Sequence, residues 1–452
     1  MEEAKDEDEI VAKSGESGQY GNDEDSDPWS TGEIKQLRTK WLQQELEEEA
    51  TNNKEIESWS SKKSLSCRRL STSARLSHSR SCHSSYVHNV ENEDIDTELG
   101  SSKREPTRFP LETSKQELKM QKCTCFLEYV DILAHLAFFG ILGVLIRYGS
   151  EVLFDDVLSV THESSIVYRD LPANMVGSFF MGWVGIVFKE HIRVFSEPLA
   201  LGLSTGLMGS ITTYAGWNQK MVVLLTSGNV AASLAGLLLG MCAAIISLLA
   251  GIDSAKASQL IIARSHPEKL ILAQEISNKK MSVSFHHGIL RSMVVAFAAF
   301  CLWGAALSLL VGGRSSQKLR ILWFACLVAP VGVWMRWHLA RFNGKGVCGK
   351  VKWLPLGTLL ANLIGATLAA ILALLQFVKT NDTAVLLLGG LQLGFIGCLS
   401  TVSTFVAEVY TMYVGRKKSK AYMYTFLTLI LGLFLCIFIY SIPSWTLDYV
   451  KW

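Results

Sequence analysis

Charged side chains are scarce in most of this sequence. It contains 43 basic and 41 acidic residues, and 18 and 26 of these lie within residues 1–125. The rest of the chain carries too little charge for an ordinary soluble domain. The ten cysteines are scattered without the paired spacing of a disulfide framework or a zinc site. The start, with Glu2 and Glu3, is acidic, whereas a secretory signal peptide begins with basic residues.

Residues 1–125 are predicted to form a disordered tail. They combine acidic runs with a Ser/Arg-rich stretch and contain few apolar side chains. So little apolar surface cannot offset the entropy of ordering a chain. Arg68-Arg69-Leu70-Ser71 suits a basic-directed kinase, and the alternative is a solvated linker with chance phosphorylation sites.

Apolar segments follow one another from about residue 126 onward. About 20 apolar residues in a helix cross the roughly 30 Å of bilayer hydrocarbon. Helices are expected because they satisfy every backbone amide within the segment. The sequence therefore predicts an all-α membrane protein with nine transmembrane helices, near residues 128–149, 165–188, 198–217, 222–250, 290–311, 321–341, 354–377, 385–410 and 422–442.

The loop charges predict the orientation. With the tail in the cytoplasm, the inner loops hold most of the basic residues of the body, among them Lys189, Lys345 and Lys417. The first outer loop is acidic, with Asp155 and Asp156. Because basic loops stay inside, the N-terminus is predicted to be cytoplasmic and the C-terminus extracellular.

The membrane body contains an internal repeat. Three motif pairs recur at an offset of 188 or 189 residues: Gly143-Val-Leu-Ile-Arg147 with Gly332-Val-Trp-Met-Arg336, Asn174-Met-Val-Gly177 with Asn362-Leu-Ile-Gly365, and Gly206-Leu-Met-Gly209-Ser-Ile-Thr212-Thr213 with Gly394-Phe-Ile-Gly397-Cys-Leu-Ser400-Thr401. Each repeat holds four spans, and one span near 290–311 lies between them. The odd helix gives the second repeat the opposite polarity, so two inverted repeats are expected, over residues 126–250 and 316–452, joined by a loop and linking helix over 251–315.

The third span of each repeat is the most irregular. Its glycines are followed by hydroxyl residues, Thr212 and Thr213 in one repeat and Ser400 and Thr401 in the other. Such a sequence can open a helix where protein or a cavity covers the freed carbonyls. The alternative is close helix packing through small residues. The recurrence favours a break associated with an ion.

The ordered motifs, occurring twice, resemble the fluoride channels of the Fluc/CrcB family. Two repeats joined by one extra helix are similar to the eukaryotic two-domain fluoride exporters, and the likeness covers about residues 126–442. The resemblance implies a passive, highly selective fluoride channel that exports the ion from the cytoplasm and protects against fluoride toxicity. It also implies two narrow fluoride paths, a plasma-membrane location and a chain that functions as a monomer.

The resemblance also assigns roles to particular residues. The pore residues that it implies are Asn174, Asn362, Thr358, Tyr214, Trp217 and Phe405. Arg147 and Arg336 would supply positive charge at the pore mouth, and the alternative is that they snorkel to the interface. The carbonyls of Gly209, Thr212, Gly397 and Ser400 would hold a structural sodium ion, a hard cation that prefers oxygen ligands.

Two departures from the family pattern separate the paths. Asp170 stands where repeat one should have the threonine that Thr358 provides in repeat two, and a carboxylate repels an anion. Val402 has lost an aromatic position. We therefore expect one conducting path, built on Asn362 and Thr358 with Tyr214 and Phe405. The path with Asn174 and Trp217 would be vestigial, although the sequence does not show which asparagine faces which aromatic pair.

Other functions fit the sequence less well. A cation-coupled secondary transporter of a small anion or metabolite normally has titratable groups in mid-membrane, and Glu408 is the one acid deep in the repeat-two motif, with Lys220 at the matching position. A membrane scaffold would leave the duplicated motifs without a purpose. The body shows no coherent nucleophile and base for an enzyme, and fluoride and lipid, not nucleic acid, are the expected partners.

Overall fold

The computed structural model describes residues 111–161, 166–265, 285–312, 316–346, 350–378 and 381–446. The chain divides into two units, Met1–Glu105 and Pro106–Trp452, and all described residues belong to the second. The predicted disordered tail thus lies outside the described residues up to residue 110, and the first described helix begins at Leu111, within the range predicted as tail. The described residues form helices joined by turns, as expected for the all-α class.

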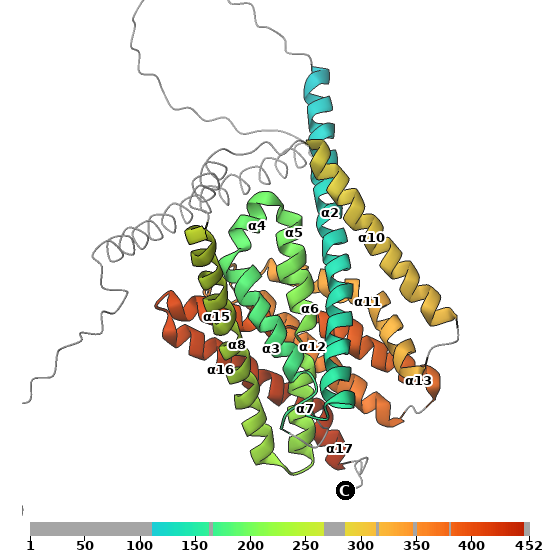
Figure 1. Ribbon diagram of the computed structural model, residues 1–452. Coiled ribbons are helices and arrows are strands. Elements are labelled where there is room, and N and C mark those ends of the chain that lie inside the picture. The colour runs from blue at the N-terminus through green and yellow to red at the C-terminus, as the bar shows by residue number, and fades with distance from the viewer. Residues whose placement is uncertain are drawn as a thin grey trace, which may run out of the picture. The chain divides into compact units, whose positions relative to one another are not determined.

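The first repeat begins with a long helix that spans most of the molecule (Figure 1). The third span of this repeat is interrupted, and several of the helices continue into π-helical turns. In chain order the elements are α2 (Leu111–Glu151), η1 (Val152–Val157), α3 (Leu171–Phe180), η2 (Met181–Val187), α4 (Lys189–Phe195), α5 (Glu197–Leu201), η3 (Gly202–Met208), α6 (Gly209–Ile211), α7 (Tyr214–Thr226) and α8 (Val230–Ser265).

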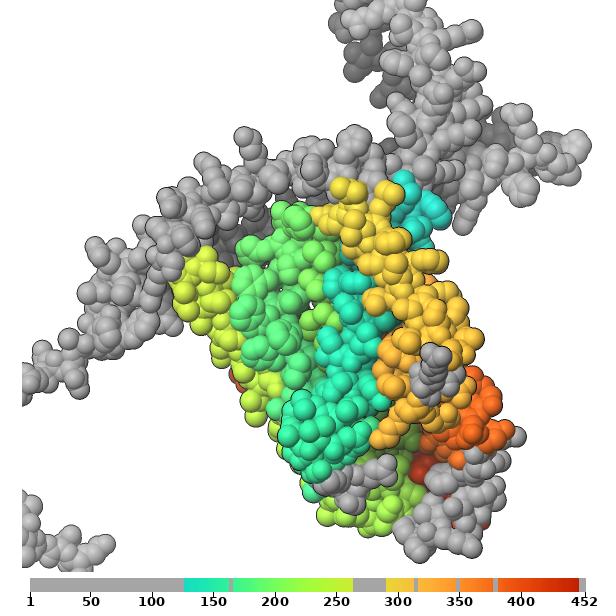
Figure 2. All heavy atoms as spheres, turned by 45° about the vertical axis from the view of Figure 1, so that its right-hand side comes forward, coloured from blue at the N-terminus to red at the C-terminus, as the bar shows by residue number. Residues whose placement is uncertain are grey.

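The linking helix and the second repeat follow. The linker α10 leans along α2 at the edge of the bundle (Figures 1 and 2). The elements are α10 (Phe285–Val311), α11 (Gln317–Ala340), α12 (Leu356–Val378), α13 (Asp382–Gly390), η4 (Leu391–Ile396), α14 (Gly397–Leu399), α15 (Ser403–Val414), α16 (Lys418–Cys436), η5 (Ile437–Ser441) and α17 (Ile442–Thr446).

The boundary between the third and fourth spans differs from the expected one. Helix α7 continues to Thr226 and α8 begins at Val230, whereas the sequence pattern placed the fourth span from residue 222. The turn between them uses Gly228 at φ +79°, a left-handed conformation that a glycine adopts without steric cost. In repeat two the equivalent helix α15 ends at Val414 and α16 begins at Lys418, each 188 residues after its counterpart in repeat one.

The described part of the chain contains seven helices that are long and apolar enough to cross a membrane. An eighth span forms if Leu171–Val187 and Lys189–Phe195 are taken together across their 65° bend. The broken segment Glu197–Thr226 is not among these spans, whereas its counterpart Asp382–Val414 is. The multi-pass architecture is thus confirmed, and the count of nine stays a prediction.

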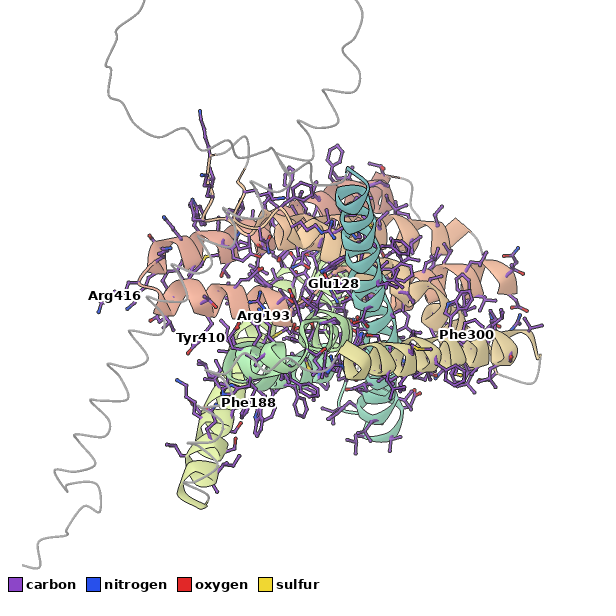
Figure 3. All side chains as sticks on the ribbon, turned by 90° about the horizontal axis from the view of Figure 1, so that it is seen from above. Glu128, Phe188, Arg193, Phe300, Tyr410 and Arg416 are labelled. Carbon is purple, nitrogen blue, oxygen red and sulfur yellow. The ribbon has the colours of Figure 1, made fainter. Side chains whose placement is uncertain are left out.

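The same pairs of elements pack in both repeats. Helix α2 lies on η3 as α11 lies on η4, and α3 packs on α8 as α12 packs on α16. The repeats meet where α2 contacts α11 and where α7 contacts α12. Helix α10 contacts only one side of this bundle, and Phe300 on it is 70% exposed, far from Arg416 on the opposite side (Figure 3).

Candidate ion pathway

Both third spans are interrupted at the predicted hydroxyl residues. Thr212 has φ −96° and ψ 144°, and Ser400 has φ −88° and ψ 155°, so both residues are extended between helical segments. The break is thus present in both repeats, and the close packing through small residues is present as well, because Gly206 lies against α2 and Gly394 against α11. The two breaks meet at the centre, where Thr212 Oγ1 lies 3.1 Å from Thr401 Oγ1 and Thr213 Oγ1 lies 3.0 Å from Ser400 Oγ.

Each motif arginine inserts into the broken span of the other repeat. Arg147 donates to the carbonyls of Gly397, at 2.9 Å, and Leu393. Arg336 donates to the carbonyls of Gly209 and Thr205 and, at 3.4 Å, to Ser400. Their exposed fractions are 1% and 4%, so neither lies at an open pore mouth or snorkels to the interface. The expected location is wrong because carbonyls released by the breaks attract both guanidinium groups.

The donor set that the resemblance assigns to sodium also lies at these breaks. The carbonyls of Gly209, Thr212, Gly397 and Ser400 are hard oxygen donors from two facing segments, as a sodium ion requires. Three of the four also accept from the arginines. A carbonyl oxygen has two lone pairs, but the two guanidinium charges on these oxygens repel a further cation, so a sodium ion at this donor set stays a prediction.

The two predicted pore asparagines hold the breaks in the same way. Asn174 Oδ1 accepts from Thr213 N at 2.8 Å, and Asn362 Oδ1 accepts from Thr401 N at 2.8 Å. Each Nδ2 donates to the carbonyl of the same threonine, at 3.2 and 3.1 Å. Both asparagines are fully buried, so each fixes the backbone of its own repeat at the break.

The second amide hydrogen distinguishes the two asparagines. Asn174 Nδ2 also donates to Tyr168 Oη at 3.2 Å. Leu356 stands where repeat two would have that tyrosine, and among the described residues Asn362 Nδ2 has no hydroxyl partner. One N–H of Asn362 is thus available to an anion, whereas the matching N–H of Asn174 is occupied.

A continuous row of aromatic and polar side chains lies on the side of repeat two. The rings of Tyr214 and Phe405 are 6.5 Å apart and those of Phe405 and Tyr424 are 5.2 Å apart, both edge to face. Tyr424 Oη donates to Glu408 at 2.8 Å, and Tyr214 Oη donates to the Thr428 carbonyl at 2.8 Å. The structure therefore brings together the predicted aromatic pair, Tyr214 and Phe405.

Thr358 and Glu408 form one end of this row. Thr358 Oγ1 donates to Glu408 Oε1 at 2.6 Å, and Asn343 Nδ2 donates to the same oxygen at 3.0 Å. With Tyr424, three donors converge on the carboxylate, and these hydrogen bonds partly offset the cost of burying a charge there. Sequence reasoning identified Glu408 only as the one acid deep in the repeat-two motif and missed Asn343 and Tyr424.

The corresponding space in repeat one is filled. Gly236 and Gly240 stand where repeat two has Tyr424 and Thr428, and the indole of Trp217 occupies that space, with Nε1 donating to the Gly236 carbonyl at 3.2 Å. Tyr168 stacks on Trp217, with the ring centres 6.2 Å apart and the planes 12° apart. No equivalent open row of donors exists among the described residues of this side.

Carboxylates crowd the end of the repeat-one side. Asp170 is hydrogen bonded to Glu151, and Arg169 Nε lies 3.6 Å from Glu151 and 3.3 Å from Asp155. Asp170, expected to repel an anion, thus belongs to an acidic group that the exposed Arg169 and the buried Arg147, with Nε 3.9 Å from Glu151, partly neutralise. Repeat two has Thr358 at the equivalent position.

Comparison with known proteins identifies the repeat. The family described as CrcB-like protein, Camphor Resistance (CrcB), matches twice, over residues 134–252 and 323–440. The chain belongs to the CrcB family. The two matches confirm the two predicted CrcB repeats, and the linking helix between them stays a prediction.

Relatives of this CrcB chain include fungal and bacterial proteins. "Fluoride export protein 1" of Neurospora crassa is 25% identical over 385 residues, which cover 73% of this chain and 69% of that protein. The protein of the same name from Candida albicans is 36% identical, over 26% of this chain and 30% of that protein. "Fluoride-specific ion channel FluC" of Sorangium cellulosum is 31% identical over 27% of this chain and 91% of its own length. No solved structure matches.

Proposed function

We propose that this protein is a passive, highly selective fluoride channel that exports fluoride from the cytoplasm and protects the cell against its toxicity. The two CrcB matches and the relatives named as a fluoride exporter and as fluoride-specific channels support this function. The observation that carries it is the single row of hydroxyl, amide and ring-edge groups on one side of the duplicated bundle.

Fluoride conduction requires replacement of the ion's strongly held water. Amide and hydroxyl groups donate hydrogen bonds to an anion, and the edge of an aromatic ring is positive. Asn362 and the ring edges of Tyr214 and Phe405 supply these groups along the repeat-two side. The hydroxyl of Thr358 donates to Glu408 in this structure and would turn to the ion, and these four residues form the conducting path of the proposal. The free N–H of Asn362 supports this choice.

The repeat-one path, with Asn174 and Trp217, is vestigial in this proposal. Three observations support closure: the Asn174 amide is held by Tyr168, the Trp217 indole fills the space over two glycines, and Asp170 lies in a group of three carboxylates, whereas Glu408 is the one carboxylate described at the matching end of the repeat-two side. Each of these raises the cost of placing an anion there.

The centre of the bundle supplies positive charge to the proposed path. Arg147 and Arg336 hold the two breaks together from opposite repeats, in place of the mouth role expected from the sequence. A structural sodium ion on the carbonyls of Gly209, Thr212, Gly397 and Ser400 would add to this charge and fix the repeats against each other. The arginines and the sodium ion would both bind backbone carbonyl oxygens, so neither role depends on which side chains stand at these four positions.

The membrane potential gives the direction of flow. Fluoride enters cells as neutral HF from acidic surroundings and ionises inside, and an inside-negative potential moves an anion outward with about 2.3 kcal/mol per 100 mV. The proposal places the protein in the plasma membrane, with a cytoplasmic N-terminus and an extracellular C-terminus, acting as a monomer. The basic inner loops support this orientation.

Efflux from liposomes that contain the purified protein tests the function. Vesicles loaded with potassium fluoride are treated with valinomycin, which releases the counter-charge, and a fluoride electrode follows the loss of the ion. The proposal predicts rapid fluoride efflux and no efflux from matched chloride vesicles. Efflux that requires a sodium or proton gradient would instead indicate a coupled transporter.

A further inference from the structure

A buried asparagine that the pathway described above does not include lies one helical turn beyond Tyr214. Asn218 on α7 is fully buried, and its Oδ1 lies 3.4 Å from Tyr214 Oη. Its Nδ2 donates to the Gly432 carbonyl at 3.2 Å and to Cys436 Sγ at 3.1 Å. The side chain thus connects α7 to the end of α16, beside the aromatic row.

The sister repeat lacks this group. The 188-residue offset pairs Asn218 with Val406, which is also fully buried, and Cys436 with Leu248. An amide among transmembrane helices often serves as an interhelical hydrogen bond. The Gly432 carbonyl accounts for one N–H of Asn218 in that way, but the other N–H needs a separate explanation.

The second N–H has a poor acceptor. The thiol hydrogen of Cys436 is donated to the Ala366 carbonyl at 3.3 Å, so its sulfur faces Asn218 as an acceptor. A thiol sulfur accepts hydrogen bonds weakly, whereas a bond to an ionised acceptor is roughly twice as strong as a neutral one. An anion arriving beside Tyr214 therefore competes easily for this N–H.

The position of Asn218 extends the row toward the outer end. Helix α7 continues from Tyr214 to Thr226, the end that the loop charges place outside. Asn362, Thr358 and Glu408 all lie at or before the Tyr214–Phe405 pair in this direction. Beyond the pair, the row has the Thr428 hydroxyl, and the backbone carbonyls nearby only accept hydrogen bonds and give an anion no donor.

We propose that Asn218 is a second amide position that binds fluoride in the outer half of the path, with one N–H turning from Cys436 Sγ to the ion. The inference rests on the proposed fluoride channel. It assigns to Cys436 the role of a weak acceptor that holds this N–H when no ion is present and releases it when one arrives.

Four variants test this inference in the liposome assay. Asn218→Val, which copies the sister residue, is expected to lower the fluoride efflux rate at least about tenfold, because the ion loses a charge-assisted bond. Cys436→Ala is expected to keep or raise the rate. Cys436→Ser is expected to lower it about threefold, because a hydroxyl oxygen is a stronger acceptor than sulfur. Val406→Ala, at the matching position of the sister side, leaves the rate within about twofold of wild type.

The fraction of vesicles that release fluoride counts folded channels, and the rate within them measures conduction. A merely structural Asn218 would change the thermal stability and the active fraction but leave the rate of the remaining channels unchanged, which would overturn the inference. Equal rates in Cys436→Ala and Cys436→Ser would also contradict it. Absence of fluoride efflux from the wild-type protein would instead refute the proposed channel itself.

Discussion

Exchanging each motif asparagine for aspartate gives the sharpest comparison between the two paths. Both amides bind their own break through the same two bonds, to the N–H and the carbonyl of Thr213 or Thr401. Asn174→Asp and Asn362→Asp therefore remove the same donor and add the same charge at equivalent positions. At the break the structural damage is similar in the two variants. Asn174→Asp also loses the donor to Tyr168 Oη, but the Tyr168 hydroxyl can donate to the new carboxylate in its place, so the effect on the conducted ion is the main difference.

The magnitude follows from the added charge. Two unit charges 4 Å apart repel by about 1 kcal/mol in water and about 4 kcal/mol at an effective dielectric constant of 20. A barrier increase of that size slows an anion by about fivefold to about a thousandfold. Because Asn362 is fully buried, we expect Asn362→Asp to lower fluoride efflux by at least about a hundredfold.

Asn174→Asp is expected to retain most of the wild-type efflux rate. Its charge joins a side that Trp217 fills and where Asp170 already adds a carboxylate. Liposome efflux rates, normalised to the fraction of active vesicles, provide the comparison. Equal loss in both variants, or greater loss in Asn174→Asp, would refute the assignment of the conducting side.

Three further predictions concern the surroundings of the path. Gly432→Ala should slow efflux severalfold, because a methyl group there meets the hydroxyl of Tyr214. The control Gly304→Ala, on the linker with no neighbour within 4 Å, should leave the rate unchanged. An unchanged rate in Gly432→Ala would contradict this prediction. Arg336→Leu should destabilise the protein by about 3 kcal/mol, measured by thermal unfolding in detergent, because a buried charge network is broken. Each kcal/mol of destabilisation lowers the melting temperature by about 2–4 °C. A melting temperature within about 1 °C of wild type would therefore contradict the role of Arg336 in joining the two broken spans. Replacing sodium by a large organic cation should lower the melting temperature if the carbonyls of Thr212 and Ser400 hold a structural ion; no change would remove sodium from the account.

The sequence predicted the features that repeat. The breaks at Thr212 and Ser400 were expected because glycines and hydroxyl residues occur in register in both halves. The aromatic pair Tyr214 and Phe405 was expected because Val402 had lost its ring. The breaks needed only a comparison of the chain with itself, whereas the aromatic pair followed from the resemblance to the Fluc/CrcB family.

Other features depend on contacts between distant residues. The burial of Arg336 could not be read from its sequence, because its partner carbonyl of Gly209 lies 127 residues away. The hydrogen bond from Asn174 Nδ2 to Tyr168 Oη depends on the turn before α3, which brings Tyr168 back toward Asn174. The fourth span was placed too early because apolar residues continue up to the turn at Gly228, where the backbone conformation, not hydropathy, ends the helix.

Single-channel recording in a planar bilayer with sodium fluoride tests the central claim most directly. One conducting path predicts a single open level, carried by fluoride and not by chloride, that persists in Asn174→Asp and is absent in Asn362→Asp. Two equal open levels that appear independently would show that both sides of the protein conduct, and would contradict the account.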